Sequence, residues 1–324
     1  MTRSRWPLPL LLAARAAGCT RPAGPARITI AVVPKGQVHV FWQSVRAGAE
    51  AAAKEAGVEM VWAAPQVETD YTGQASIVED FINRRVSALV LAPSHHKALV
   101  GVAERAADAG IPVVVMDSPL DSSRPLSYVA TDNHQGGVLA AREMGRLLGG
   151  KGKVAVVGIA AGSGSGLERE GGFQETIQKE FPGIELLGLQ YSDSDRSKAL
   201  SVAEDFLSRA PDLAGMFGSN ESAAVGVFRA VQNRGKKGLV EVVGFDASSD
   251  LLEALRDGTI EALVMQNPFR IGHDAVAAAV AATRKQPVER RIDTGVLVVT
   301  RDNLESPEVQ KVLGSGKVTE PRRP

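Results

Sequence analysis

The stretch Val113-Val114-Val115-Met116-Asp117 is an apolar run that ends in a carboxylate, and it returns later in the chain as Val242-Val243-Gly244-Phe245-Asp246. A short apolar run without polar alternation is typical of a strand that is buried on both faces. Strands of this kind belong to parallel sheets covered by helices, and such sheets bind ligands at the carboxyl ends of their strands. We therefore expect Asp117 and Asp246 to face one ligand site.

Similar apolar runs recur along the chain, separated by Ala-rich stretches with a helical period. Gly57 and Gly110 follow two of these stretches, as expected where a helix ends in a left-handed residue. The sequence predicts parallel-sheet strands at 28–33, 58–63, 87–92, 113–116, 154–159, 184–190, 213–218, 240–245 and 260–266.

The two halves of the chain repeat each other. Gly57-Val58-Glu59 stands 126 positions before Gly183-Ile184-Glu185, and Ala88-Leu89-Val90-Leu91 stands 126 positions before Ala214-Gly215-Met216-Phe217. A repeat of whole βα units predicts two lobes of the same α/β topology, each with a parallel sheet between two layers of helices. A ligand site shared by the two lobes would then be the cleft between them.

Composition narrows the possible functions. The 324 residues carry 37 Lys plus Arg and 37 Asp plus Glu, without long runs of one charge, so no nucleic-acid partner is expected. The single cysteine leaves none for a disulfide, and the five histidines form no zinc-binding motif. Neither a cofactor nor a metal is expected.

The N-terminus is typical of an exported lipoprotein. Arg3 and Arg5 precede an apolar stretch over 6–14, and Ala16-Ala17-Gly18 precedes Cys19. This pattern predicts a lipoprotein signal peptide over 1–18, with Cys19 as the acylated first residue of the mature protein. A tether over 19–26 and a flexible tail over 314–324 flank the folded part. The leader is too short for a transmembrane helix.

A Gly-rich segment, Gly162-Ser163-Gly164-Ser165-Gly166, follows the strand predicted at 154–159. Its spacing completes neither a dinucleotide-binding fingerprint nor a nucleophile elbow. We interpret it as a loop that makes room for a bulky partner near Arg169. Arg169 offers five fixed hydrogen-bond donors, although an arginine on a solvated helix face is an equally good interpretation of its position.

Several polar residues lie where predicted strands end. A purely structural role is one interpretation of these residues. Helix capping or a turn would explain Asn220, Asp246 and Asp117, and a crossover between the lobes would explain Gln266. The aromatic pair Phe41-Trp42 begins the first helix, where a ring can be part of the core or a platform for a ligand.

Nearly the whole mature chain resembles the periplasmic ribose-type sugar-binding proteins that serve ABC importers. The resemblance rests on segments that occur in order along the chain: 88–93, 110–117, Thr131-Asp132-Asn133 with Gly136-Gly137, Arg169 with Gly172-Phe173, Ser219-Asn220-Glu221 and 243–246. It implies the type I periplasmic binding fold, in which a three-strand hinge joins the lobes. We expect crossings near 130–132, 266–268 and 293–295, an N-terminal lobe of 27–131 plus 267–293, and a C-terminal lobe of 132–266 plus 294–313.

The resemblance also assigns roles to single residues. The polar residues that bind sugar hydroxyls correspond to Asp117, Arg169, Asn220, Asp246 and Gln266. The aromatic residues that stack on the sugar correspond to Phe41 and Trp42. Three positions depart from the ribose-binding pattern: His39 and Ala92 replace Asn, and Ser118 replaces Arg. These replacements argue against ribose as the ligand.

The implied function is a monomeric, lipid-anchored solute-binding protein that delivers a sugar or polyol to an ABC importer permease and performs no chemistry. A receptor of the same fold coupled to chemotaxis or a sensor kinase stays open as an alternative. A sugar-responsive transcription regulator would need a helix-turn-helix domain before the first strand, where only residues 1–27 stand. A dinucleotide-dependent enzyme would need the completed glycine fingerprint.

Overall fold

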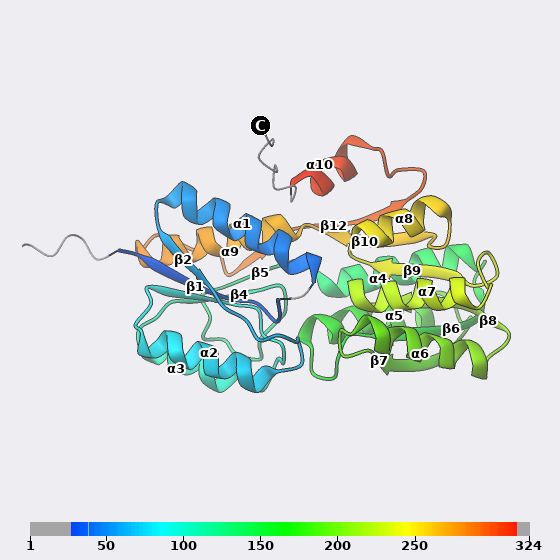
Figure 1. The fold of residues 1–324 in the computed structure, drawn as a ribbon, viewed down its shortest axis with the longest axis horizontal. Coiled ribbons are helices and arrows are strands. Elements are labelled where there is room, and N and C mark those ends of the chain that lie inside the picture. Colours follow the sequence, from blue (N-terminus) through cyan, green and yellow to red (C-terminus); the bar gives the residue numbers. More distant parts are fainter. Residues whose placement is uncertain (1–26, 38, 316–324) are drawn as a thin grey trace, which may run out of the picture.

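The computed structural model describes residues 27–37 and 39–315, which form two six-stranded sheets lying end to end (Figure 1). We call the first sheet with its helices the N-terminal lobe and the second sheet with its helices the C-terminal lobe. The strand orders are β11-β5-β4-β3-β1-β2 and β12-β10-β9-β8-β6-β7, so the two lobes share one topology. The repeat in the sequence and the two-lobed fold are confirmed.

The N-terminal lobe has an entirely parallel sheet. Its strands are β1 (Thr29–Val33), β2 (Glu59–Trp62), β3 (Ala88–Leu91), β4 (Val113–Met116), β5 (Ser127–Ala130) and β11 (Arg291–Asp293). Helices α1 (Val40–Ala56) and α9 (Pro268–Thr283) pack on one face, and α2 (Tyr71–Asn83) and α3 (Val100–Asp108) pack on the other. Both sheet faces are therefore buried, which explains the uninterrupted apolar runs.

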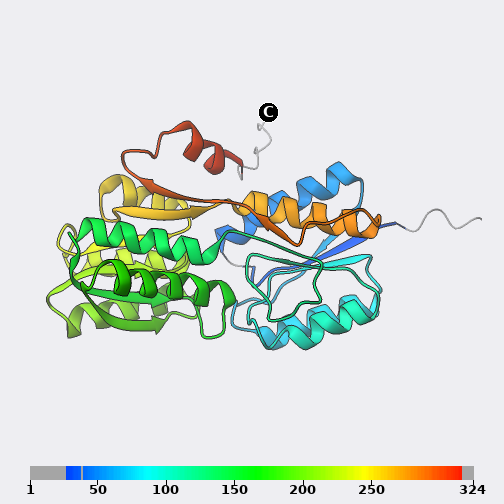
Figure 2. The ribbon, with the colours of Figure 1, turned by 180° about the vertical axis from the view of Figure 1, so that it is seen from behind.

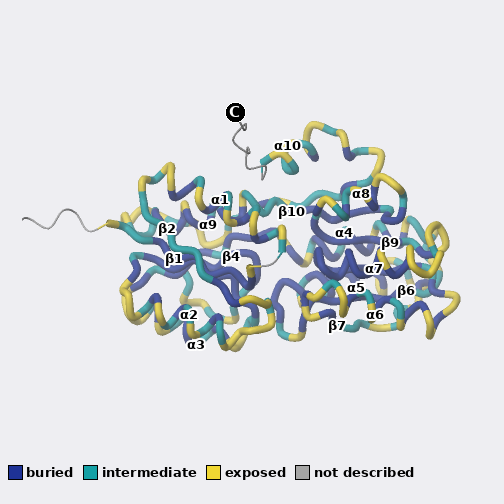
Figure 3. The backbone as a smooth tube through the Cα atoms, in the orientation of Figure 1, coloured by how far each residue is buried: buried dark blue, intermediate teal, exposed yellow. Residues whose placement is uncertain are grey.

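The C-terminal lobe repeats this arrangement. Its strands are β6 (Lys151–Gly158), β7 (Gly183–Tyr191), β8 (Leu213–Gly218), β9 (Glu241–Phe245), β10 (Ala262–Gln266) and β12 (Val296–Thr300), of which β12 alone is antiparallel to its neighbour. Helices α4 (Asn133–Leu147) and α5 (Gly164–Glu180) cover one face. The other face carries α6 (Arg196–Arg209), α7 (Glu221–Asn233), α8 (Ser249–Asp257) and α10 (Pro307–Ser315). Figure 3 shows the buried strands between the partly exposed helices.

The predicted strands are all present, with ends that differ by no more than three residues. The sequence prediction did not include the strands β5, β11 and β12, which all lie next to crossings between the lobes. β5 and β11 lack a long apolar run, whereas the apolar run of β12 was missed. The predicted tail over 314–324 is wrong at its start, since α10 continues through Ser315. The apolar residues Val309, Val312 and Leu313 pack this helix on the C-terminal lobe.

The chain passes between the lobes after β5, after β10 and between β11 and β12. Figure 2 shows the last of these segments running from one lobe to the other. The first and third crossings touch, because Thr131 Oγ1 donates to the carbonyl of Gly295 at 3.2 Å. The crossings join the two sheets so that the carboxyl ends of strands from both lobes lie in one region of the molecule.

Two helix pairs pack through glycine. A Cβ added at Gly48 or Gly272 would lie 1.9 Å from a carbonyl oxygen of the other helix in the α1–α9 pair. Gly137 and Gly172 have the same role between α4 and α5. A Cβ added at these residues would lie 2.0 and 2.3 Å from a carbonyl oxygen of the other helix. The second pair determines where the α5 backbone, and therefore Arg169, lies.

The predicted export leader, Cys19 and tether lie outside the described residues. Within the described part of the chain, no helix is both long enough and apolar enough to span a bilayer.

Candidate functional site between the lobes

Asp117 and Asp246 occupy equivalent places in the two lobes, directly after β4 and β9. Both have a left-handed backbone conformation, with φ of 63° and 73°. Non-glycine residues with positive φ are uncommon and concentrate at functional sites. Both residues are buried.

These two aspartates help to line a small cavity between the lobes. The cavity also brings together Phe41, Trp42, Arg169, Asn220 and Gln266, the other residues that the sequence singled out. The remaining lining residues are Lys35, His39, Glu68, Ile159, Ser165, Glu221 and Ser222. The space between the lining atoms, including its opening to solvent, is about 330 Å³.

Asp117 forms a buried ion pair with Lys35, whose Nζ lies 2.9 Å from Asp117 Oδ2. Lys35 follows β1 at the same edge of the N-terminal sheet. The same ammonium group donates to Ser165 Oγ in the C-terminal lobe at 2.9 Å. Lys35 therefore links the acidic edge of one lobe to the first turn of α5 in the other.

Arg169 is buried, with 2 % of its surface exposed, so the alternative of a solvated helix face is wrong. Its Nε donates to Asn133 Oδ1 at 2.8 Å and its Nη1 donates to the carbonyl of Ser219 at 3.0 Å. The guanidinium carbon lies 3.8 Å from the centre of the Phe245 ring. These contacts hold the guanidinium plane in one orientation at the cavity wall.

Asp246 accepts hydrogen bonds from Gln266 Nε2 at 2.7 Å and from the backbone amide of Glu221 at 3.0 Å. Burial raises the pKa of the Asp246 carboxyl, while the nearby charge of Arg169 opposes this shift. Gln266 Oε1 and Glu221 Oε2 are buried without a hydrogen-bond partner. The site thus offers acceptor atoms that a ligand hydroxyl could satisfy.

Asn220 is the N-cap of α7, because its Oδ1 accepts from the amide of Ala223 at 3.0 Å. Its Nδ2 donates to Ser194 Oγ, which in turn donates to Glu68 Oε2 in the N-terminal lobe. Asn220 is therefore a helix cap that also lines the cavity.

The Phe41 and Trp42 rings meet edge to face, with centres 5.0 Å apart and planes at 84°. Trp42 is buried in the core of the N-terminal lobe, and its Nε1 donates to Glu68 Oε1 at 2.7 Å. Phe41 is only partly buried. The pair thus belongs to the core and to the cavity wall at once.

The lobes touch directly around the cavity. The Nδ1 atom of His39 lies 3.2 Å from Ser222 Oγ. The backbone amide of His96 donates a hydrogen bond to the carbonyl of Gly162 at 3.0 Å. Ser118 Oγ accepts from the amide of Ser165 at 2.9 Å. The molecule is therefore in a closed conformation, with side chains from both lobes in contact.

The Gly-rich loop serves this contact, which corrects its predicted role. A Cβ at Gly162 would lie 2.4 Å from His95 Nε2, and a Cβ at Gly164 would lie 2.8 Å from Pro119. The glycines make room for the N-terminal lobe rather than for a bulky partner beside Arg169.

Sequence reasoning missed Lys35 and Glu68 as cavity residues. Lys35 had a usable signal, because a charged residue follows the first strand at the edge where ligands bind. Glu68 had none, since it lies between β2 and α2 in a loop without a motif.

The three departures from the ribose-type pattern differ in their positions. His39 lines the cavity, whereas Ser118 and Ala92 do not. Ser118 is completely buried in the contact with Ser165, and the Ala92 carbonyl accepts from Gln74 Nε2. Neither of these two residues supplies a side-chain donor to the cavity.

Comparison with known proteins identifies the family of this chain. The family model described as periplasmic binding protein domain matches residues 30–287. The chain is 32 % identical over 261 residues to the ribose import binding protein RbsB of Bacillus subtilis, covering 81 % of this chain and 83 % of that protein. It is 34 % identical over 267 residues to the D-allose-binding periplasmic protein of Escherichia coli, covering 80 % and 85 %.

A solved structure gives the same result. An ABC transporter solute binding protein from Agrobacterium vitis with bound D-fucose superposes with a TM-score of 0.85 at 39 % identity, covering 87 % of this chain and 98 % of that chain. The chain belongs to the periplasmic binding protein domain family, and the predicted resemblance is confirmed.

Proposed function

We propose that this family member is the solute-binding component of an ABC importer, which captures a sugar or related polyhydroxylated molecule between its lobes and delivers it to a permease. Relatives bearing the names of ribose, D-allose and D-fucose binders support this assignment. The observation that carries it is the meeting of buried charged and amide side chains from both sheets around one cavity.

In this function, Asp117, Asp246 and Gln266 bind ligand hydroxyls and Arg169 and Asn220 complete the polar set. A sugar presents hydroxyl donors and acceptors around its ring. Each hydroxyl that is buried on binding needs a hydrogen-bond partner, and charged partners form the strongest hydrogen bonds. The ring's CH faces are apolar, so Phe41 and Trp42 stack on them. Binding is the whole activity, and no catalytic step is involved.

Closure of the lobes completes the site. Lys35, Ser194 and Ser165 already connect the lobes through side-chain hydrogen bonds. Ligand binding stabilises this closed arrangement because residues on both sides must reach one molecule at once. The proposed lobes are 27–131 plus 267–293 and 132–266 plus 294–315, where the second lobe ends with α10.

The cellular setting is part of the same proposal. Cys19 carries the lipid that holds the mature protein at the membrane, on the periplasmic or outer side. The protein acts as a monomer whose partners are the small ligand and the permease.

A thermal-shift screen tests the binding function. Pentoses, hexoses, sugar alcohols and nucleosides are added in turn to the purified protein. A ligand at about 100 times its dissociation constant should add about 2.7 kcal/mol of stability and raise the melting temperature by roughly 2 to 4 °C. The proposal fails if every sugar and polyol leaves the melting temperature unchanged while another compound class raises it.

A further inference from the structure

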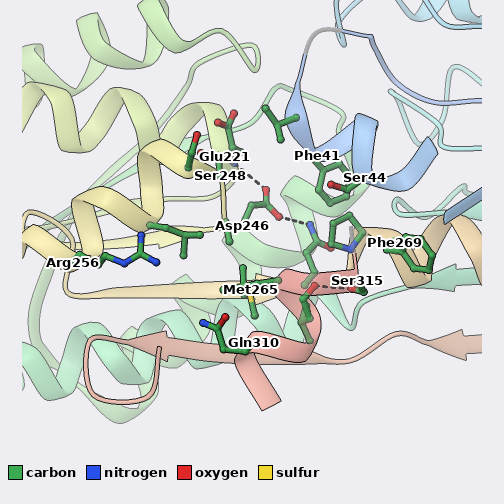
Figure 4. Close-up of a pocket in the computed structure, with 18 residues that line it drawn as sticks. Phe41, Ser44, Glu221, Asp246, Ser248, Arg256, Met265, Phe269, Gln310 and Ser315 are labelled. Carbon is green, nitrogen blue, oxygen red and sulfur yellow. Dashed lines mark hydrogen bonds between the residues drawn. The ribbon is translucent and has the colours of Figure 1, made fainter. Parts of the chain in front are cut away.

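A second cavity adjoins the cleft, and we name it the α10 chamber (Figure 4). Phe41, Glu221, Asp246 and Gln266 line both spaces. The two spaces can be compared by the smaller volume within which the centre of a water molecule can lie. This volume is about 350 Å³ in the chamber and about 30 Å³ in the cleft. The chamber is therefore the larger open space, and it shares these four residues with the cleft.

The walls of the chamber are mainly apolar and come from both lobes. Phe41 and Phe269 contribute rings from α1 and α9, and Leu252, Met265, Val312 and Leu313 face them from the C-terminal lobe. Apolar walls with a few polar groups are the common composition of small-ligand pockets.

One buried polar atom points to a ligand rather than to an apolar plug. Ser248, which lines the chamber and not the cleft, has its Oγ buried without a hydrogen-bond partner. Ser248 occupies the N-cap position of α8, yet its side chain makes no capping bond. A ligand hydroxyl would stabilise this buried Oγ.

One wall of the chamber is built by the last helix of the described chain. The family-model match ends at residue 287, whereas α10 covers Pro307–Ser315. Gln310, Val312, Leu313 and Ser315 of this helix line the chamber.

Resting on the sugar-binding function above, we propose that the ligand is a glycoside. Its sugar ring lies in the cleft at Asp117 and Asp246, and its aglycone or second sugar ring lies in the α10 chamber. The amphipathic chamber suits such a group because a sugar ring or an aryl group with hydroxyls presents both apolar faces and hydroxyl donors.

Calorimetric titration tests this inference with defined probes. The probes are D-ribose, D-allose, D-fucose and D-galactose, their methyl and phenyl glycosides, and disaccharides of the common linkages. We expect at least one phenyl glycoside or disaccharide to bind roughly tenfold or more tightly than its parent monosaccharide, equal to about 1.4 kcal/mol.

Variants that fill the chamber provide the control. Leu252→Trp and Ser249→Trp should remove the preference for the glycoside while the parent sugar keeps its affinity within about threefold. Ser249 is exposed, so Ser249→Trp does not disturb the core. This second variant still tests the inference if Leu252→Trp fails to fold. Leu239→Trp is the matched control, because Leu239 is 68 % exposed and lines neither cavity. Ser248→Ala should weaken glycoside binding alone.

The outcomes separate the two proposals. Binding of free sugars with no glycoside preference would overturn the inference and leave the sugar-binding function intact. Binding of no sugar and no glycoside would overturn both. A glycoside preference that arises only after residues 316–324 are removed would also overturn it, because the chain's own C-terminus would then be the occupant of the chamber.

Discussion

Arg169 lies with its guanidinium carbon 3.8 Å from the ring centre of Phe245, and Phe245 is the residue directly before Asp246. This stacking ties the cation on α5 to the strand end that carries the carboxylate. Asn133 joins the same group to the N-terminal lobe, because its Nδ2 donates to the Asp117 carbonyl at 3.1 Å while its Oδ1 accepts from Arg169. One buried arrangement therefore positions polar groups of both lobes.

Replacing Arg169 or Asp246 with alanine should weaken ligand binding. Each change leaves the polar partners of a charged group unpaired in a buried cleft, which costs on the order of 2 to 5 kcal/mol, or roughly 30-fold or more in affinity. Calorimetric titration with the best ligand of the screen measures this loss. Arg142→Ala, at an exposed ion pair with Glu180, should leave affinity within about threefold. Wild-type affinity in both cleft variants would show that these residues are only structural.

The neighbouring glycines of α5 should respond in opposite directions. Gly172→Ala brings a methyl group to 2.3 Å from the His134 carbonyl oxygen and should lower the free energy of unfolding by about 1 to 3 kcal/mol. Gly171→Ala meets nothing closer than 3.9 Å and should raise it by about 0.5 to 1 kcal/mol, since alanine favours a helix interior. Urea unfolding of both variants checks this. Equal effects would contradict the close α4–α5 contact.

Glu170 should make stability depend on pH. Burial raises the pKa of its carboxyl to about 7, although the Ile159 amide and the Ser219 hydroxyl both donate to its Oε1. The native state therefore holds this proton more strongly than the unfolded chain does. The resulting stability is fully present below about pH 4.5 and is lost as the pH rises through 7, by about 3 kcal/mol in total.

Glu170→Gln isolates this contribution, because the amide keeps the accepting oxygen and cannot ionise. Unfolding free energies from pH 5 to 8 should fall less in the variant than in the wild type. Burial also raises the pKa of Glu261 to about 7, but this residue is present in both proteins and cancels in the comparison. Parallel pH profiles for the two proteins would refute the assignment.

Ribose should not be the best ligand. Ser118 is used in the contact between the lobes and Ala92 offers no side-chain donor, so two donors expected in a ribose site are missing. We expect ribose to bind at least roughly tenfold more weakly than the best ligand, or about 1.4 kcal/mol. A competition titration over sugars and polyols that ranked ribose first would contradict this prediction. It would indicate that His39 compensates for the two missing donors.

Cys19→Ser should block lipid attachment. If Cys19 is acylated, the wild-type protein partitions with membranes and the variant is released or stays unprocessed. Fractionation and mass spectrometry of the mature N-terminus measure the result. A fully soluble wild type, cleaved at another position, would contradict the lipoprotein assignment.

The sequence by itself determined the elements and their repetition. Buried parallel strands must be apolar on both faces, so runs such as Val113–Met116 are visible without any tertiary information. The strand-end rule then identified Asp117 and Asp246, because their place depends only on where each strand stops. The segments resembling a known family singled out Arg169, Asn220 and Gln266, which also line the cleft.

Only the tertiary structure decided how those residues meet. Lys35 pairs with Asp117 and contacts Ser165, 130 positions away, because the three crossings bring the two sheet edges together. The burial of Arg169, the inclusion of Glu68 and the chamber beside α10 arise in the same way. Local patterns fix strands and helices, whereas a cleft is made by segments distant in sequence, and its contents depend on the packing of both lobes.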